Sequence, residues 1–139
     1  MNVPTLLLSH PECLQHIAGP GHPESPERLA SVLKSLEDPK LFPDLLKREA
    51  SIAEREVIYA AHDPAYVDAI FSAVPASGFR SIDPDTGLSA GSGIAALRAA
   101  GAMTEAVDSV LTDKAHRAFC AVRPPGHHAE RSRAMGFCL

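Results

Sequence analysis

The chain has 139 residues, about the length of one domain, and its 45% content of hydrophobic residues indicates a folded protein and not a disordered one. Its net charge of -4 argues against the dense basic surface that nucleic-acid and anionic-membrane partners usually require. No apolar run approaches the roughly 18 residues of a membrane span, and neither a signal peptide nor paired cysteines are evident. These features predict a cytoplasmic protein that binds neither nucleic acid nor membrane.

The first third of the chain predicts a strand, a loop and a helix. Residues 3–9 form a short apolar run that suits a buried strand, and residues 10–24 are rich in histidine, glycine and proline, which favours an irregular loop. A helix is expected to begin after Ser25, a good N-cap, with Pro26 at the first helical position. Its buried face would consist of four residues at helical spacing: Leu29, Val32, Leu33 and Leu36.

The remaining segments continue this alternation. Residues 56–61 predict a strand, and Asp63 can cap a helix that begins at Pro64. Residues 75–93 contain six glycines and prolines and predict a long loop, which inside a domain is often functional. A helix is expected over residues 94–111 and a short strand over residues 117–122. The apolar side of that helix would be formed by Leu97, Met103, Val107, Val110 and Leu111.

Strands that alternate with helices predict an α/β protein with a parallel sheet. Ligands bind such sheets at the carboxyl ends of the strands. The segment that follows the last predicted strand is therefore the expected place of the chemistry.

That segment contains two adjacent histidines, His127 and His128, after Pro124, Pro125 and Gly126. On a regular helix or strand, neighbouring side chains point in different directions. A loop stiffened by two prolines and freed at a glycine can aim both rings at one place. Two close imidazoles also titrate as a coupled pair, so that one stays neutral as a base while the other supports charge.

Other candidate residues in the sequence carry weaker signals. Cys138 near the histidines suggests a nucleophile, but its apolar neighbours favour a buried, inert thiol. His10, His16 and His22 lack the spacing and carboxylates of a metal site, so we expect them to structure their loop or to lie near the mouth of a pocket.

Residues 123–129, Arg-Pro-Pro-Gly-His-His-Ala, followed by Gly-Phe-Cys at 136–138, resemble the signature of the histone deacetylase superfamily. The sequence is most similar to the bacterial branch of histone-deacetylase-like amidohydrolases and acetylpolyamine amidohydrolases. Residues 21–29, 62–67, 83–86 and 89–101 resemble further family segments, so the likeness spans nearly the whole chain. It implies that residues 1–139 are the N-terminal, incomplete part of one deacetylase domain with an arginase/deacetylase-like α/β fold, a parallel sheet in three layers.

The resemblance also implies an activity, the zinc-dependent hydrolysis of acetyl amides on lysine or polyamines. In that activity His128 would be the general base that takes a proton from water and later protonates the leaving amine. His127 would orient the reactants and stabilise charge. Gly136 and Phe137 would line the narrow tunnel that holds the methylenes of the substrate.

Three further residues receive roles from the resemblance, each with a plain structural alternative. Asp83 or Asp85 would hold the substrate backbone at the tunnel rim, or would only cap a turn. Arg28 would face the internal channel through which acetate leaves, or would lie on the helix surface.

The family's zinc ligands, an Asp-x-His pair and a second Asp, lie downstream of Gly-Phe-Cys together with its oxyanion-stabilising tyrosine, and this chain contains none of them. We therefore expect no zinc bound by this chain alone and no deacetylation by it. An incomplete parallel sheet predicts self-association or binding of a complementary C-terminal fragment. The alternative is a catalytically inactive truncated fragment or an interaction module with the same fold start. An ordinary metal-free binding domain would require the His-His loop to be coincidence.

Overall fold

The fold is built on strand β1, Thr5–Ser9, which is the middle strand of a parallel sheet in the order β2-β1-β5. Strand β2 spans Leu45–Glu49 and strand β5 spans Ala118–Cys120. The computed structural model describes residues 4–139. Val3, the first residue of the strand expected from the sequence, lies outside the described residues, and the strand is confirmed over Thr5–Ser9.

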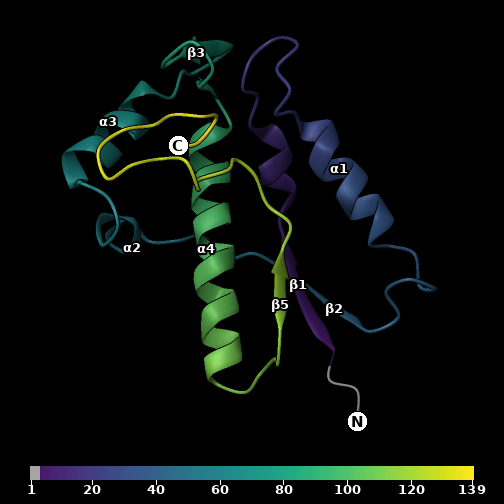
Figure 1. Cartoon of the computed structure of the whole chain (residues 1–139). Coiled ribbons are helices and arrows are strands. Elements are labelled where there is room, and N and C mark those ends of the chain that lie inside the picture. Colours follow the sequence, from purple (N-terminus) through teal and green to yellow (C-terminus); the bar gives the residue numbers. More distant parts are fainter. Residues whose placement is uncertain (1–3) are drawn as a thin grey trace.

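Helices cover both faces of the sheet, because successive leucines of β1 point in opposite directions. Leu6 and Leu8 pack against the alanines of helix α4, Ser92–Leu111. Leu7 packs on the other face, against the short 3-10 helix η1, Pro11–Gln15, and against helix α1, Pro26–Ser35. The central strand is therefore apolar on both faces, and the expected three-layer α/β arrangement is confirmed (Figure 1).

The predicted starts of two helices are confirmed. Helix α1 follows Ser25, whose backbone is extended although its side chain makes no capping hydrogen bond. Helix α3, Pro64–Ala73, follows Asp63, whose Oδ1 accepts a hydrogen bond of 3.0 Å from the backbone N–H of Ala65. The predicted apolar face of α1 was wrong at Val32, which is 41% exposed, since the helix turns only Leu29 fully into the core.

The prediction of a strand over residues 56–61 was wrong. Arg55–Tyr59 is instead the short helix α2, which packs against α3. The β-branched pair in that segment favoured a strand, but the open sheet position belongs to β2. Strand β2 has the sequence Leu-Leu-Lys-Arg-Glu, which lacks the apolar pattern of a buried strand. It lies at the edge of the sheet, and four of its five residues are exposed.

The expected loop over residues 75–93 contains a small antiparallel hairpin of β3, Phe79–Ser81, and β4, Gly87–Ser89. Strand β4 is buried and leads directly into helix α4. The hairpin thereby carries the sequence between Ile82 and Thr86 to the same end of the molecule as the C-terminal segment (Figure 1).

Helix α4 meets the sheet through its small residues, which corrects the predicted apolar face. Ala95, Ala102 and Ala106 are buried. The large side chains point away from the core and are 38–76% exposed: Met103, Val107, Val110 and Leu111. Small residues let the helix approach closely, whereas the sequence pattern favoured the bulky ones. No helix in residues 4–139 combines the length and hydropathy needed to cross a bilayer.

Gly101 tests the close approach of α4. A Cβ at this position would lie 1.9 Å from the carbonyl oxygen of Ser51, so Gly101→Ala must displace backbone. We expect a loss of about 1–3 kcal/mol in the free energy of unfolding, measured by urea denaturation, despite the better helix propensity of alanine. Gly93→Ala in the same helix meets only the Phe71 and Val74 side chains and should be nearly neutral. Equal effects of both substitutions would contradict this packing.

Candidate active site

The candidate site lies at the carboxyl ends of β1 and β5. Residues 10–24 leave the sheet after β1, and residues 121–128 leave it after β5, as the parallel topology requires. The backbone N–H of Ala121 still bonds to the carbonyl of Leu8, at 2.8 Å, before the chain turns into the His-His loop.

The two histidines lie side by side in this loop. The ring centroids of His127 and His128 are 4.3 Å apart and their planes are inclined by 52°. A turn closes the loop through a 3.2 Å hydrogen bond from the N–H of Ala129 to the carbonyl of Gly126. Both histidines are exposed among the described residues, so both rings are accessible to a ligand.

The segment Met135 to Leu139 packs directly on the His-His loop. A tight turn joins Met135 and Cys138 through two backbone hydrogen bonds of 3.0 and 3.1 Å. Gly136, with φ +58°, brings its Cα so close to His128 that a Cβ would lie 3.0 Å from the Cβ of that histidine. The glycine is therefore required for the contact between the two segments.

Cys138 takes part in this packing and not in an exposed reactive site. Its side chain is fully buried, and its Sγ accepts a 3.3 Å hydrogen bond from the backbone N–H of His128. The structure therefore gives this thiol a place in the turn, in agreement with the expectation of a buried thiol.

Phe137 has an unusual backbone conformation, which a hidden threonine supports. Its φ of +71° is costly for a bulky residue, about 1–3 kcal/mol. The hydroxyl of Thr86, a residue only 2% exposed, accepts a 3.2 Å hydrogen bond from the Phe137 N–H and donates one of 3.0 Å to Oδ1 of Asp85. Sequence reasoning missed Thr86, because the contact joins positions 51 residues apart.

Asp83 and Asp85 lie in the same turn after β3. Oδ1 of Asp83 accepts a 3.0 Å hydrogen bond from the backbone N–H of Asp85. Partial burial acts to raise the pKa of Asp83, but hydrogen bonds from Asp85 and Thr86 outweigh it and hold that pKa below its usual value. Asp83 thus structures the turn, and the carboxylate of Asp85 reaches towards Phe137 through Thr86.

His22 contacts both Phe137 and the turn that holds Asp85. Its ring meets the ring of Phe137 edge to face at a centroid distance of 4.6 Å. Its Nε2 is 2.8 Å from the carbonyl oxygen of Asp85, and its Nδ1 accepts a 3.0 Å hydrogen bond from the N–H of Glu24. These hydrogen bonds agree with the expectation of a histidine that structures its loop.

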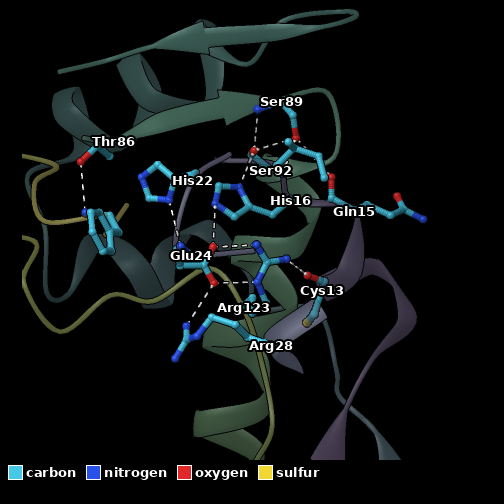
Figure 2. A network of polar contacts seen from close by, with 12 residues as sticks. Cys13, Gln15, His16, His22, Glu24, Arg28, Thr86, Ser89, Ser92 and Arg123 are labelled. Atoms are coloured by element: carbon cyan, nitrogen blue, oxygen red, sulfur yellow. Dashed lines mark hydrogen bonds and ion pairs between the residues drawn. The ribbon is translucent and has the colours of Figure 1, made fainter. Parts of the chain in front are cut away.

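A buried ion pair lies beneath the His-His loop, and no sequence pattern had indicated it. Arg123 donates two hydrogen bonds of 2.6 Å, from Nε and Nη2, to the two carboxylate oxygens of Glu24 (Figure 2). Its Nη1 donates to the carbonyl of Cys13 at 2.8 Å. Arg123 is 4% and Glu24 3% exposed, so each charge depends on the other for compensation.

His16 completes this cluster as a buried neutral imidazole. Its Nδ1 is 2.7 Å from Oγ of Ser92, at the start of α4, and its Nε2 faces Oε2 of Glu24 at 3.7 Å. Burial, and then the positive charge of Arg123, lower the pKa of His16 to about 4, which the carboxylate of Glu24 opposes only in part.

Arg28 lies on the outer side of the same cluster. Its side chain is 66% exposed, and its Nη1 is 3.8 Å from Oε1 of Glu24. It lines an open hollow of about 640 Å³ together with Phe119, Val122 and Arg123, between α1 and β5. The structure therefore places Arg28 both on the surface of α1 and beside the buried ion pair.

A second, apolar groove of about 550 Å³ borders the His-His loop on the other side. It runs between α3 and α4 and reaches Pro125, His127 and Leu139. Tyr66 lines it, and its buried hydroxyl has no hydrogen-bond partner within residues 4–139. Burial raises the pKa of that hydroxyl.

The described residues do not supply a zinc site. Within residues 4–139, no three side chains of histidine, cysteine, aspartate or glutamate converge as metal ligands would. The two imidazoles of His127 and His128 alone do not form the nitrogen and carboxylate set that the family resemblance implies.

The comparisons with known proteins agree with this geometry. The histone deacetylase domain family matches residues 22–139, and the chain belongs to that family. The probable deacetylase of Archaeoglobus fulgidus is 35% identical over 96% of the chain and 37% of its own length. The histone deacetylase-like amidohydrolase of Pseudomonas aeruginosa is 34% identical over 91% of the chain and 38% of its own length.

A solved structure shows the same fold. The crystal structure of the HDA15 HD domain superposes with a TM-score of 0.89 at 30% identity, and the match covers 99% of the chain and 40% of that structure. The chain therefore spans about two-fifths of the length of these relatives.

The buried imidazole of His16 predicts a loss of stability in acid. The unfolded chain protonates this side chain near the ordinary imidazole pKa of 6.5, but the folded chain does so only at a pKa of about 4. Its contribution is therefore complete above pH 6.5 and is lost as the pH falls to about 4, a total of about 3 kcal/mol. Urea denaturation at several pH values measures this loss.

The matched comparison uses His16→Asn and His116→Gln. The first variant should lose most of the acid sensitivity between pH 6.5 and 4. His116 is exposed and lies at the opposite end of β5, so its substitution should leave the pH profile unchanged. An unchanged profile in His16→Asn would contradict the assignment.

Proposed function

We propose that the chain is part of a zinc-dependent deacetylase that hydrolyses acetyl amides of lysine or polyamines, and that it carries the acid–base residues of that enzyme. The observation that carries the proposal is the contact between two segments of the family signature. The His-His loop and the Gly136-Phe137-Cys138 turn pack against each other through Gly136 and His128. In the proposed enzyme, this contact would put the acid–base pair next to an aromatic wall.

In this proposal, His128 takes a proton from the attacking water and returns it to the leaving amine. The ring of His127, 4.3 Å away, orients the reactants and stabilises the charge that develops during the reaction. Both rings are exposed in the described chain, so proton exchange with a bound substrate is sterically possible.

The substrate would enter beside Phe137, whose ring is held at the rim by His22 and whose backbone is held by Thr86. An apolar aromatic wall suits the methylenes of lysine or of a polyamine. Asp85 would receive a polar or cationic group at the rim, and Asp83 would hold the turn in shape. Arg28 would face the path by which acetate leaves, along the hollow that it shares with Arg123.

The zinc of such an enzyme would polarise the amide and acidify the attacking water. Since the described residues do not fit a zinc site, its ligands would come from the portion of a deacetylase domain that this chain does not match. The functional assignment therefore concerns the assembled domain, and this chain alone is proposed to be inactive.

The remaining portion would cover three surfaces. The first is the exposed stripe of α4, Met103, Val107, Val110 and Leu111. The second is the edge of β5, which has a strand neighbour on only one side among the described residues. The third is the apolar groove at Tyr66, whose unpartnered hydroxyl would gain a partner. These surfaces favour a complementary fragment, and self-association is the competing occupant.

The alternative function is an inactive fragment or an interaction module with the same fold. Both proposals share the geometry described above. They differ in whether catalysis appears when the complement is supplied.

Assembly of a complete domain tests the proposal. The chain is expressed alone and together with the part of the Archaeoglobus fulgidus deacetylase that lies beyond the matched region. We expect bound zinc and hydrolysis of acetyl-lysine peptides or acetylpolyamines only in the coexpressed pair, measured by elemental analysis and product release. Zinc-dependent, hydroxamate-sensitive hydrolysis by the chain alone would contradict the proposal. A stable complex that binds zinc but hydrolyses neither substrate would favour the interaction module.

Substitution of the proposed base gives a sharper measurement. In the active pair, His128→Ala should lower kcat by about 100-fold to 10,000-fold, because it removes the proton acceptor. His116→Ala changes an exposed histidine at the far end of β5 and should leave kcat unchanged. Near-normal turnover in His128→Ala would remove the assigned role.

A further inference from the structure

The segment between His22 and Glu24 contacts both functional parts of the site. The ring of His22 reaches the carbonyl of Asp85. The carboxylate of Glu24 reaches Arg123, the first residue of the Arg-Pro-Pro-Gly-His-His segment (Figure 2). The contacts of Glu24 are buried and those of His22 lie nearer the surface, and none of the three residues has a catalytic role in the function proposed above.

The rim arm is His22. Its Nε2–H donates to the carbonyl of Asp85, while its Nδ1 accepts from the N–H of Glu24. A carbonyl accepts and a backbone N–H donates, so these two partners select the neutral Nε2–H tautomer. The ring is thereby fixed in its edge-to-face contact with Phe137, at 4.6 Å between centroids.

The loop arm is Glu24. Its carboxylate holds both Nε and Nη2 of Arg123, in a two-point contact that fixes the guanidinium in position and in plane. Arg123 directly precedes Pro124 and Pro125, and the fixed φ angles of these two prolines limit backbone rotation between Arg123 and the turn at Gly126. The orientation of Arg123 is therefore transmitted over a short, stiff segment to the histidines.

The two arms are joined inside the segment. The hydrogen bond from the Glu24 N–H to Nδ1 of His22 couples the backbone of one arm to the side chain of the other. Arg123 also holds the carbonyl of Cys13, and His16 closes the remaining side of Glu24. These contacts anchor the segment to the turn after β1.

We propose that Glu24 and His22 are positioning residues of the site: Glu24 sets the His-His loop through Arg123, and His22 sets the tunnel wall at Phe137. The short segment between them keeps the acid–base pair and the wall in register. This inference rests on the proposed deacetylase function, but its first two tests do not require catalysis.

The first test uses the unmodified chain. A guanidinium bound at two points and 4% exposed should exchange its Nε–H with solvent at least about tenfold more slowly than that of Arg80, an exposed arginine. Nuclear magnetic resonance of arginine-labelled protein measures both rates. Equal exchange at the two arginines would overturn the proposal for Glu24.

The second test compares two buried or partly buried glutamates that bind arginine. Glu24→Gln should shift the ring resonances of both His127 and His128. Glu105→Gln is the control, because Glu105 pairs with Arg48 at 3.5 Å and bonds to Ser51, away from the His-His loop. It should lower stability and leave those resonances at their wild-type positions. Unshifted histidine signals in folded Glu24→Gln, or equal shifts in both variants, would overturn the proposal.

If Glu24→Gln does not fold, the same comparison uses Glu24→Asp and Glu105→Asp. Each substitution keeps the negative charge but shortens the side chain by one methylene. In Glu24→Asp we expect the two-point contact with Arg123 to be lost while the charge pair remains. The same criteria apply.

The role of His22 is tested with His22→Phe, which keeps a ring beside Phe137 but removes both hydrogen bonds. This substitution should shift the Phe137 resonances. Unchanged Phe137 signals would overturn the role of His22.

The third test separates positioning from the chemistry itself. In the active assembled domain, Glu24→Gln should lower kcat about 10-fold to 100-fold with little change in KM, because it displaces the acid–base pair. His22→Phe should mainly raise KM, because it displaces the wall that holds the substrate. Equal effects of both variants on both constants would overturn the division of roles. Resonance shifts without any deacetylase activity would count against the proposed function and not against the positioning.

Discussion

The arrangement of the site depends on one buried ion pair, Arg123 with Glu24. Burial removes both charges from water at a cost of several kcal/mol for each, which mutual attraction and hydrogen bonds offset only when the geometry is good. Both carboxylate oxygens of Glu24 accept a hydrogen bond of 2.6 Å from Arg123, and Nη1 of Arg123 donates to the carbonyl of Cys13. Loss of either partner would leave an uncompensated charge in the core. The loops that carry the two residues are consequently held together wherever the fold is intact.

This constraint explains why irregular backbone can form a defined site. Residues 10–25 and 121–139 contain little regular structure besides η1, yet both segments are anchored by buried side chains, among them Glu24, Arg123 and Cys138. This arrangement has an energetic cost at His16. Burial and the positive charge of Arg123 lower the pKa of its imidazole to about 4, so that protonation of His16 in acid opposes folding. Phe137 shows it again, since its positive φ is maintained by a hydrogen bond from its N–H to Thr86. The energy that such features require comes from packing elsewhere in the domain.

The sequence predicted the parts of the fold that depend on local chemistry. The helix starts after Ser25 and Asp63, the apolar run of β1 and the loop nature of the His-His segment all follow from neighbouring residues, and the structure confirms them. The family resemblance rested on short motifs of consecutive residues, and family membership was confirmed over residues 22–139. Contacts across long sequence distances could not be predicted in this way. Arg123 and Glu24 are 99 positions apart, and Phe137 and Thr86 are 51 apart.

The errors have a common physical origin in tertiary context. The β-branched residues of α2 favour a strand by propensity, but strand propensity is weaker than tertiary context. The edge position beside β1 is taken by β2, although three of the residues of β2 are charged. In α4, the bulky residues were expected to face the core, whereas alanines and Gly101 do so because the helix lies close to Ser51 and to the sheet. Hydrophobic periodicity identifies an apolar side, but it does not say which of two apolar sides meets the sheet.

That second apolar side of α4 links the fold to the proposed function. A helix that is apolar on opposite faces is stable in water only when both are covered. Small residues cover one face against β1, and Met103, Val107 and Leu111 leave the other open among the described residues. The relatives extend over more than twice the length of this chain, and the matched part of the HDA15 HD domain is 40% of that structure. The same additional portion that would cover α4 would also have to bring the zinc ligands to His127 and His128. Under the proposed function, completion of the core and completion of the catalytic site would be one event, and activity would depend on folding of the whole domain.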